Sequence, residues 1–436
     1  MKRGIKILFG CFIIICAVFV INKVLTYILV DDADDEVRYA MHELYKQENI
    51  ETLFLGSSHV FCGYDPLILD EILGENTYLA STPVQKPDGS YYLLKEALKK
   101  NDIKKVYLDM YYCQYRDMPA ERGGAQMYYI YCITDYMKGD WNRTEFLLNA
   151  SGCNLYIESF LPAARYGNYL LDLNRFERVV KSKRSAEYIH YENAPSNFYK
   201  GAMNVPGEPG APKMIVEDSK IAAIAENAVS EYSLQCLDKI VKLCKEEGIE
   251  LVLVNTPVTD FYLQTIGNYD TYYECVKNYA QDNGLEYYDF NLCKKDILSM
   301  EDSDFLDFHH LSGQGVVKYS TVFAEMMTSY DEEERQAFFY DSVQEKMNDL
   351  PSQTMGVLLQ QSEEEENLYY LKTIANYDVD TEYRICILDE QGEECGLLQD
   401  FSGENIIRLS ADQQTTFKIT VRDKNTGEIC EEGTIN

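Results

Sequence analysis

The chain has 436 residues, of which 46% are apolar and 26% charged, so it can bury a core in more than one domain. Its 25 glycines and 11 prolines are too few for a fibrous or largely disordered protein. Asp and Glu outnumber Lys and Arg by 72 to 40, which gives a net charge of −32. Such an acidic surface repels phosphate backbones, so the composition excludes a general nucleic-acid-binding protein.

The N-terminus carries a long apolar segment. Every residue from 7 to 21 is apolar or glycine, and after a short polar break the apolar character resumes as far as residue 30. These 24 residues exceed the roughly 20 that a helix needs to cross the hydrocarbon core. We predict a cytoplasmic stub and transmembrane helix within residues 1–30, with 7–30 in the membrane. The basic residues before the helix favour a cytoplasmic N-terminus and an extracytoplasmic remainder. A cleaved signal peptide is the competing interpretation, but no small-residue cleavage site follows the segment.

Residues 31–350 contain short apolar runs that alternate with helical patterns. This alternation is typical of a parallel sheet covered by helices. We predict an α/β domain, a flavodoxin-like three-layer α/β/α sandwich around a five-stranded parallel sheet. The expected strands are residues 52–55, 77–80, 106–110, 251–254 and 286–290.

Two parts of the chain depart from this alternation. Residues 111–215 form a long insertion, which we expect to fold over the carboxyl edge of the sheet and shape a substrate groove. A peripheral helical cap without contact to substrate is the alternative. Residues 351–436 contain alternating apolar and polar residues between turn signals, which predicts a small all-β sandwich domain.

The 13 cysteines show no metal-binding or disulfide pattern. No C-x-x-C pair occurs and the spacing is irregular, so the sequence predicts no zinc site. We also expect no organic cofactor.

Two segments carry the residues for nucleophilic catalysis. The first expected strand runs into Gly56-Ser57-Ser58-His59, where glycine permits a sharp turn and the serines begin a helix. The second segment, after the fifth strand, contains Asp307-Phe-His-His310-Leu. With a spacing of three, the Asp307 carboxylate can orient the His310 imidazole, which can then take a proton from a serine. Each segment alone also fits an N-cap serine or a solvated turn.

Together these segments resemble the SGNH/GDSL hydrolase superfamily. Gly56-Ser57-Ser58 stands where that family has its nucleophile block, and Asp307-Phe-His-His310-Leu matches its closing block. The resemblance covers roughly residues 50–330 and implies Ser58 as nucleophile, His310 as base and Asp307 as the residue that orients it. The family's usual glycine and asparagine of the oxyanion hole have no clear counterparts here.

Other polar residues follow the expected strands. The backbone N–H groups of Ser58 and of Ala80 or Ser81 are the candidate oxyanion donors. Tyr111, Tyr112 and Asn255 follow the third and fourth strands, so we expect them to line a substrate groove. Asn255 fits a turn before Pro257 equally well.

The anchor together with these blocks is similar to the DltD proteins of D-alanyl-lipoteichoic-acid synthesis and to anchored SGNH proteins that work with membrane-bound O-acyltransferases. We therefore expect an extracytoplasmic serine esterase or O-acyltransferase that acts on acyl, most economically acetyl, esters of cell-envelope glycans. Its expected partners are the acylated glycan and a membrane-bound O-acyltransferase. The alternative is a catalytically weak or inactive scaffold that binds glycan or assists such an acyltransferase, including DltD-like roles.

Overall fold

The computed structural model describes residues 2–116, 118, 122–192, 194, 198–203, 207–212, 214–224, 229–365, 367–409 and 415–435, without the side chains of residues 2–4 and 125. The helices of eight residues or more are α1 (Lys2–Leu29), α2 (Glu36–Lys46), α4 (Pro66–Leu73), α5 (Pro87–Ala97), α6 (Gly124–Thr134), α7 (Trp141–Ala150), α9 (Leu173–Lys183), α11 (Glu231–Glu247), α13 (Tyr269–Asn283) and α14 (Gly313–Ser329). Shorter helices are α3 (Ser58–Phe61), α8 (Tyr156–Phe160), α10 (Ala186–His190), α12 (Asp260–Thr265), α15 (Glu332–Gln336) and α16 (Val343–Asp349). A 3₁₀ segment, η4 (Pro162–Tyr169), follows α8.

The central sheet is parallel and has five strands in the order β2-β1-β3-β7-β8. This confirms the predicted three-layer α/β/α architecture, and all five strands lie where the apolar runs are. They are β1 (Thr52–Gly56), β2 (Thr77–Ser81), β3 (Lys105–Asp109), β7 (Glu250–Asn255) and β8 (Glu286–Asp289).

Side-chain alternation along each strand divides the core between the two faces of this sheet. Leu53 and Leu55 of β1 pack with the buried faces of α2, α5, α11 and α13. Phe54, between them, packs on the other side against Leu69 of α4 and Val316 of α14. The sheet is therefore buried on both faces, as parallel sheets require, and its polar residues gather at the strand ends.

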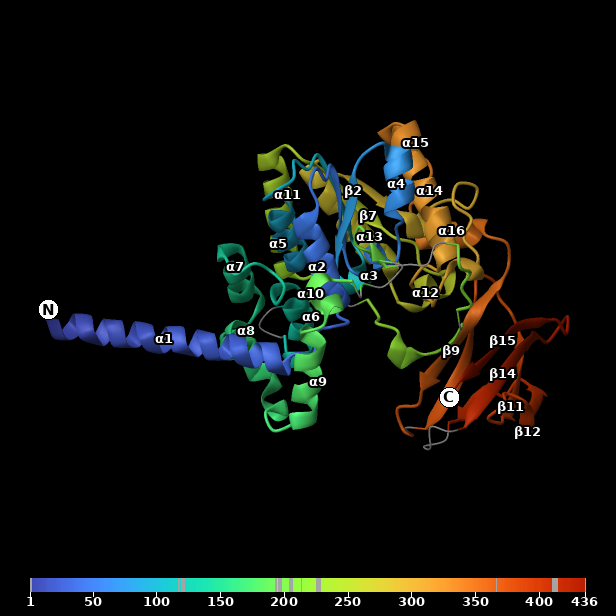
Figure 1. Ribbon diagram of the computed structural model, residues 1–436. Helices are drawn as coiled ribbons and strands as arrows, with labels where there is room; N and C mark the ends of the chain where they lie inside the picture. Colours follow the sequence, from blue (N-terminus) through green and yellow to red (C-terminus); the bar gives the residue numbers. More distant parts are fainter. Residues whose placement is uncertain are drawn as a thin grey trace.

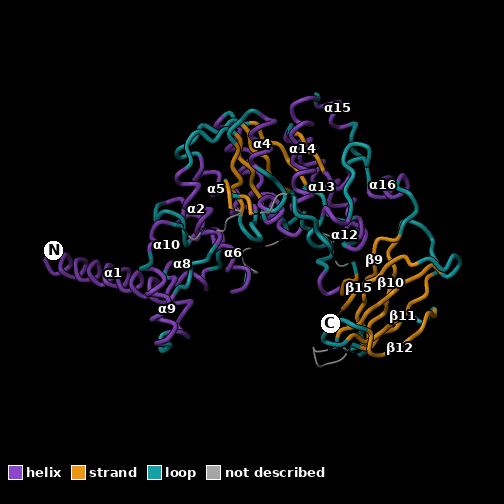
Figure 2. Tube along the Cα trace, turned by 45° about the vertical axis from the view of Figure 1, so that its right-hand side comes forward, coloured by secondary structure: helices purple, strands orange, loops and turns teal. Residues whose placement is uncertain are grey.

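The C-terminal region forms two four-stranded sheets (Figures 1 and 2), which confirms the predicted all-β domain. One sheet has the order β13-β10-β9-β6 and the other β12-β11-β14-β15. The strands are β9 (Thr354–Gln361), β10 (Leu368–Ala375), β11 (Thr381–Leu388), β12 (Glu394–Ser402), β13 (Ile406–Arg408), β14 (Thr416–Asp423) and β15 (Ile429–Ile435), joined by β6 (Ile215–Glu217).

Strand β6 was not predicted, and it changes the organisation of the chain. It pairs in parallel with β9, so three residues at the boundary where the predicted insertion ends complete a sheet of the C-terminal domain. Ile215 packs among the core residues of the two sheets. The β-domain is thus tied to the α/β domain by two separate stretches of chain.

The described part of residues 111–215 forms a helical layer beside α1, α2 and α5 (Figure 1). It also contains a two-stranded hairpin, β4 (Phe198–Tyr199) and β5 (Ala202–Met203), whose Lys200 carbonyl accepts a hydrogen bond from Leu79 of β2 at 3.0 Å. Gly210 N–H donates to the Ser303 carbonyl at 2.7 Å, close to the segment that carries Asp307. The helices lie beside the sheet, whereas Tyr111 and the segment around Gly210 lie at its carboxyl edge, so both alternatives for the insertion stay open. Residues 117, 119–121, 193, 195–197, 204–206 and 213 of the predicted insertion lie outside the described residues.

Helix α1 extends away from the folded domain (Figures 1 and 2). Its residues Ile5–Leu29 are long and apolar enough, by length and composition, to cross a membrane.

Candidate active site

The nucleophile segment lies at the carboxyl end of β1, where the chain turns into α3. Two features make the turn tight. A Cβ on Gly56 would meet the Cβ of Asp109 and a methyl of Val60 at 2.6 Å each. The Thr256 hydroxyl, from the segment after β7, donates a hydrogen bond to the His59 carbonyl at 3.1 Å and so joins α3 to the end of β7, two strands away in the sheet. Ser58 is therefore the first residue of a short helix at a fixed point on the sheet edge.

The second segment returns to this edge as a small closed loop. Leu306 N–H donates to the His310 carbonyl at 2.8 Å, and Phe305 and Leu311 form an antiparallel bridge. Thr259 holds the loop from outside, because its N–H and its hydroxyl both donate to the Phe308 carbonyl, at 3.2 and 2.7 Å.

The structure brings Ser58, His310 and Asp307 together. Ser58 Oγ lies 2.8 Å from His310 Nε2, and His310 Nδ1 lies 2.8 Å from Asp307 Oδ2. The other carboxylate oxygen of Asp307 accepts the backbone N–H groups of His309 and His310, each at 2.8 Å. The arrangement has the connectivity of a nucleophile, a base and an orienting carboxylate.

The Asp307 carboxylate stays ionised in this setting. Burial alone would raise its pKa, but the hydrogen bond from His310, the neighbouring His309 and His310 rings and the His309 N–H together hold the pKa well below its ordinary range. A negative charge next to His310 Nδ1 favours the tautomer that leaves Nε2 free to accept the serine proton.

Two further histidines surround the central imidazole. His59 is buried, stacks on the Tyr111 ring with a centroid separation of 3.7 Å, and has its Nε2 3.3 Å from His309 Nδ1. The centroids of His309 and His310 are 3.9 Å apart. Burial lowers the pKa of His59 well below its ordinary value, and burial with the adjacent His310 lowers that of His309 to about 4. In the sequence, the only indication of this histidine cluster is that His59 follows Ser58 and His309 precedes His310.

Ligand nitrogens of His59, His309 and His310 lie within 4.8 Å of one another, a spacing that could hold a metal ion. Because both nitrogens of His310 already bond Ser58 and Asp307, a metal on this residue would displace one of those hydrogen bonds.

The candidate oxyanion donors lie next to the nucleophile. Ser81 pairs with Gly56 in the β1–β2 register, and Ala80 pairs with Leu55, so both are at the same sheet edge as Ser58. The Ser81 hydroxyl is buried and has no hydrogen-bond partner among the described residues. The N–H of Ser58, in the first turn of α3, has no intrahelical acceptor.

The residues expected in a groove instead line an internal cavity. Tyr111, Tyr112 and Asn255 share a cavity of about 10 Å³, room for about one water molecule. Tyr112 is buried with its hydroxyl 2.8 Å from that of Tyr262. Asn255 is buried too and donates to Tyr269, Tyr287 and Asp289. The prediction that Tyr112 and Asn255 line a groove is therefore wrong. A polar side chain at the end of a strand can point inward when buried groups are present to hydrogen-bond with it.

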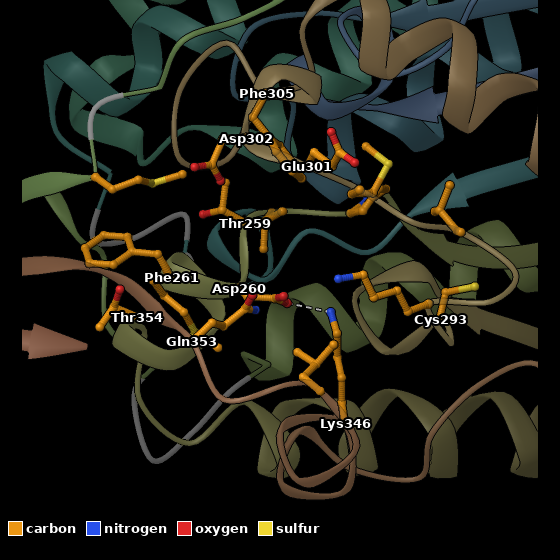
Figure 3. Close-up of a pocket in the computed structure, with 18 of the residues that line it drawn as sticks. Thr259, Asp260, Phe261, Cys293, Glu301, Asp302, Phe305, Lys346, Gln353 and Thr354 are labelled. Carbon is orange, nitrogen blue, oxygen red and sulfur yellow. Dashed lines mark ion pairs between the residues drawn. The ribbon is translucent and has the colours of Figure 1, made fainter. Parts of the chain in front are cut away.

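A larger cavity of about 290 Å³ lies between the α/β domain and the β-domain, and none of the three triad residues lines it (Figure 3). Asp260 and Lys346 form an ion pair of 2.6 Å within it. Thr259 borders this cavity and also donates to the Phe308 carbonyl, so the cavity lies directly behind the loop that carries Asp307 and His310. An open hollow of about 430 Å³ borders Asp307 itself and is lined partly by Ile215 and Ile435 of the β-domain.

Comparisons with known proteins add little to this geometry. A family model without a functional description matches residues 204–331, less than a third of the chain, so no family membership follows. A comparison with curated proteins found no match. Among solved structures, the chain matches a Bacteroides fragilis protein described as "a putative acylhydrolase", with 10% identity, a TM-score of 0.30, and coverage of 71% of this chain and 98% of that chain. A likeness this low carries no argument about fold or activity.

Proposed function

We propose that the protein is a serine esterase or O-acyltransferase of the SGNH type, with Ser58 as nucleophile, His310 as general base and Asp307 as the orienting carboxylate. The observation that carries the proposal is the continuous hydrogen-bonded chain from Ser58 Oγ through His310 to Asp307, with both steps at 2.8 Å. Three residues from segments about 250 positions apart meet in the order that covalent acyl transfer needs.

In the proposed reaction, Ser58 Oγ attacks an ester carbonyl carbon while its proton moves to His310 Nε2. The carbonyl oxygen becomes an oxyanion. Its candidate hydrogen-bond donors are the backbone N–H groups of Ser58 and of Ala80 or Ser81. The tetrahedral intermediate then breaks its bond to the leaving alcohol, which takes the proton from His310. In the second half of the reaction, His310 takes a proton from water in hydrolysis, or from a glycan hydroxyl in transfer, while that oxygen attacks the acyl carbon. The bond between the acyl group and Ser58 Oγ then breaks, and Oγ takes the proton back from His310.

The proposed substrate is an acyl ester, most economically acetyl, on a cell-envelope glycan. The support is positional: an apolar helix of membrane-spanning length tethers the domain, with the glycan layer as the nearest polymer. A net charge of −32 disfavours polyphosphate chains as direct substrates.

The test is acetate release from O-acetylated envelope polysaccharide, and acyl transfer to a soluble glycan acceptor, by the full-length protein in vesicles. Ser57→Ala is the matched control, since the Ser57 hydroxyl is buried and has no hydrogen-bond partner among the described residues. We expect Ser58→Ala to abolish both activities and Ser57→Ala to keep them. Equal activity in Ser58→Ala and the wild type would contradict the proposal and favour the scaffold alternative.

A further inference from the structure

Helix α1 changes its surroundings near residue 22. Residues 7–21 are exposed except for Gly10, whereas Asn22 and Leu25 are partly covered and Leu29 is buried. The covering elements are η4 and α9, which pack along the last turns of α1.

Specific hydrogen bonds fix this contact. The Asn22 side-chain oxygen accepts the Ala163 N–H of η4 at 3.1 Å. The Arg175 guanidinium of α9 donates to the Leu29 carbonyl at 3.3 Å. Beyond the helix, Lys183 of α9 pairs with Asp32 at 2.8 Å. The end of α1 is thus part of the folded domain, which is the arrangement of a retained anchor and not of a cleaved leader.

The exposed part of α1 is too short to cross a bilayer alone. At 1.5 Å per residue, residues 5–21 span about 25 Å, less than the roughly 30 Å of a hydrocarbon core. The missing length is about three residues, which are those at the start of the stretch packed against η4. A bilayer that covers the whole apolar span of α1 therefore also reaches η4 and α9, which pack against the end of that span.

Those elements carry an unusual set of exposed apolar side chains. Leu171 and Leu173 are 93% and 76% exposed. Leu170, Phe176 and, on the adjacent α8, Ile157 are exposed as well. Clustered exposed apolar residues of this kind mark an interaction surface.

Helix α9 also has the charge pattern of an interfacial helix. Leu173 and Phe176 lie three residues apart on one side, while Lys181 and Arg184, at and just beyond its end, are exposed cations in a strongly acidic protein. Cations beside an apolar stripe suit a helix that lies in the plane of a membrane surface, where lipid phosphates are the counterions.

We propose that η4 and α9, with the loop between them, form a membrane seat that inserts into the bilayer leaflet facing the folded domain. The seat is the set Ile157, Leu170, Leu171, Leu173 and Phe176. Its occupant is lipid: the apolar side chains lie in the acyl-chain region around α1, and the polar groups of Asn22 and Ala163 satisfy one another there, as a low-dielectric setting requires. The seat would hold the domain in one orientation, with the β-domain at the end of the molecule farthest from α1 (Figure 1).

Tryptophan fluorescence in vesicles with brominated lipids tests this proposal. The chain has one tryptophan, so Trp141→Phe provides a silent background for the full-length protein. Leu171→Trp then reports on the seat, and Leu398→Trp, on exposed β12 of the β-domain, is the matched control. The vesicles contain phosphatidylcholine and phosphatidylglycerol, brominated either near the glycerol end or near the methyl end of the acyl chains.

We expect the Leu171→Trp emission to fall about twofold with bromine near the glycerol end and less with bromine near the methyl end, because an interfacial segment buries its apolar face only about 5–10 Å. The Leu398→Trp emission should not change. Equal, solvent-like emission from both variants would overturn the proposal, and would also be the result if a membrane protein, and not lipid, covered this face. Leu173→Trp repeats the measurement should Leu171→Trp fail to fold.

Discussion

His59 and His309 surround His310, the proposed general base, with two uncharged rings. Burial depresses the pKa of both, so near neutral pH neither places a positive charge beside His310. This matters because proton transfer from Ser58 makes His310 a cation, and a second cation 4–5 Å away would oppose that step. The ionised Asp307 then acts as the partner of the charge that develops.

Loss of the Asp307 carboxylate should lower kcat far more than it changes substrate binding. We expect Asp307→Asn to lower kcat by about 10²–10⁴ with little change in KM, because an amide no longer holds the productive tautomer. Initial rates with p-nitrophenyl acetate measure this. Asp302→Asn is the control, since Asp302 lies on the same segment and lines the cavity behind the loop. Equal losses in both variants would mean that Asp307 has no special role.

Asp109 is a buried carboxyl beneath the nucleophile turn. Burial raises its pKa from 3.8 to about 7, against the lowering effect of hydrogen bonds from the Tyr111 and Thr256 N–H groups. Because the folded-state pKa lies above the ordinary value, the stabilisation is full below about pH 4 and is lost as pH rises through 7. We therefore expect ionisation of Asp109 to contribute a fall in the melting temperature between pH 5 and pH 8, opposed by His59 and His309, whose lowered pKa values favour the folded state as the pH rises.

The Asp109→Asn variant should lose part of that fall, since an amide does not ionise. Thermal unfolding at pH 5 and pH 8 measures the difference, and Asp102→Asn, whose side chain is 86% exposed, should behave as the wild type. Glu431, with its pKa raised to about 7 by burial, contributes to the fall in the same direction and is unaffected by either change. An unchanged pH dependence in Asp109→Asn would show that its carboxyl is already ionised at pH 5.

At the scale of elements, the catalytic loop depends on a contact from outside its own segment. Thr259 caps α12 by accepting the Tyr262 N–H at 3.2 Å and also donates to the Phe308 carbonyl, so one side chain joins a helix start to the segment that bears the base. The loop that carries Asp307 and His310 is positioned by this contact.

Removal of the Thr259 hydroxyl should therefore affect catalysis by displacing the loop that carries Asp307 and His310. We expect Thr259→Val to lower kcat about tenfold or more, because small displacements of a catalytic group are costly, and to lower the melting temperature through the lost cap. Thr259→Ser keeps the hydroxyl and should restore both. A Thr259→Val variant that is less stable yet has unchanged kcat would limit the residue to a structural role.

The sequence predicted the elements that local patterns specify and missed those that depend on distant partners. The five strands of the sheet follow from apolar runs, and Ser58, Asp307 and His310 from strand ends that must share one edge. Strand β6 could not be predicted, because three residues have no periodicity and its partner, β9, lies about 140 residues later. The inward position of Asn255 was equally hidden, since it depends on Tyr269, Tyr287 and Asp289 from later elements.

At the scale of the whole molecule, α1 and the β-domain lie at opposite ends, with the α/β domain between them (Figures 1 and 2). The hollow beside Asp307 is shared by the catalytic loop and the β-domain, through Ile215 and Ile435. The β-domain therefore lies beside the segment that carries Asp307, while the helices of the insertion lie on the side of α1.

The most direct test of the account is covalent labelling of the full-length protein with a fluorophosphonate, followed by peptide mass spectrometry. An activated serine reacts because His310 removes its proton, whereas an ordinary surface serine does not. We predict one adduct, on Ser58, in the wild type and in Ser57→Ala, no adduct in Ser58→Ala, and strongly reduced labelling in His310→Gln. Folded wild-type protein that carries no adduct, or carries it on another serine, would contradict the account.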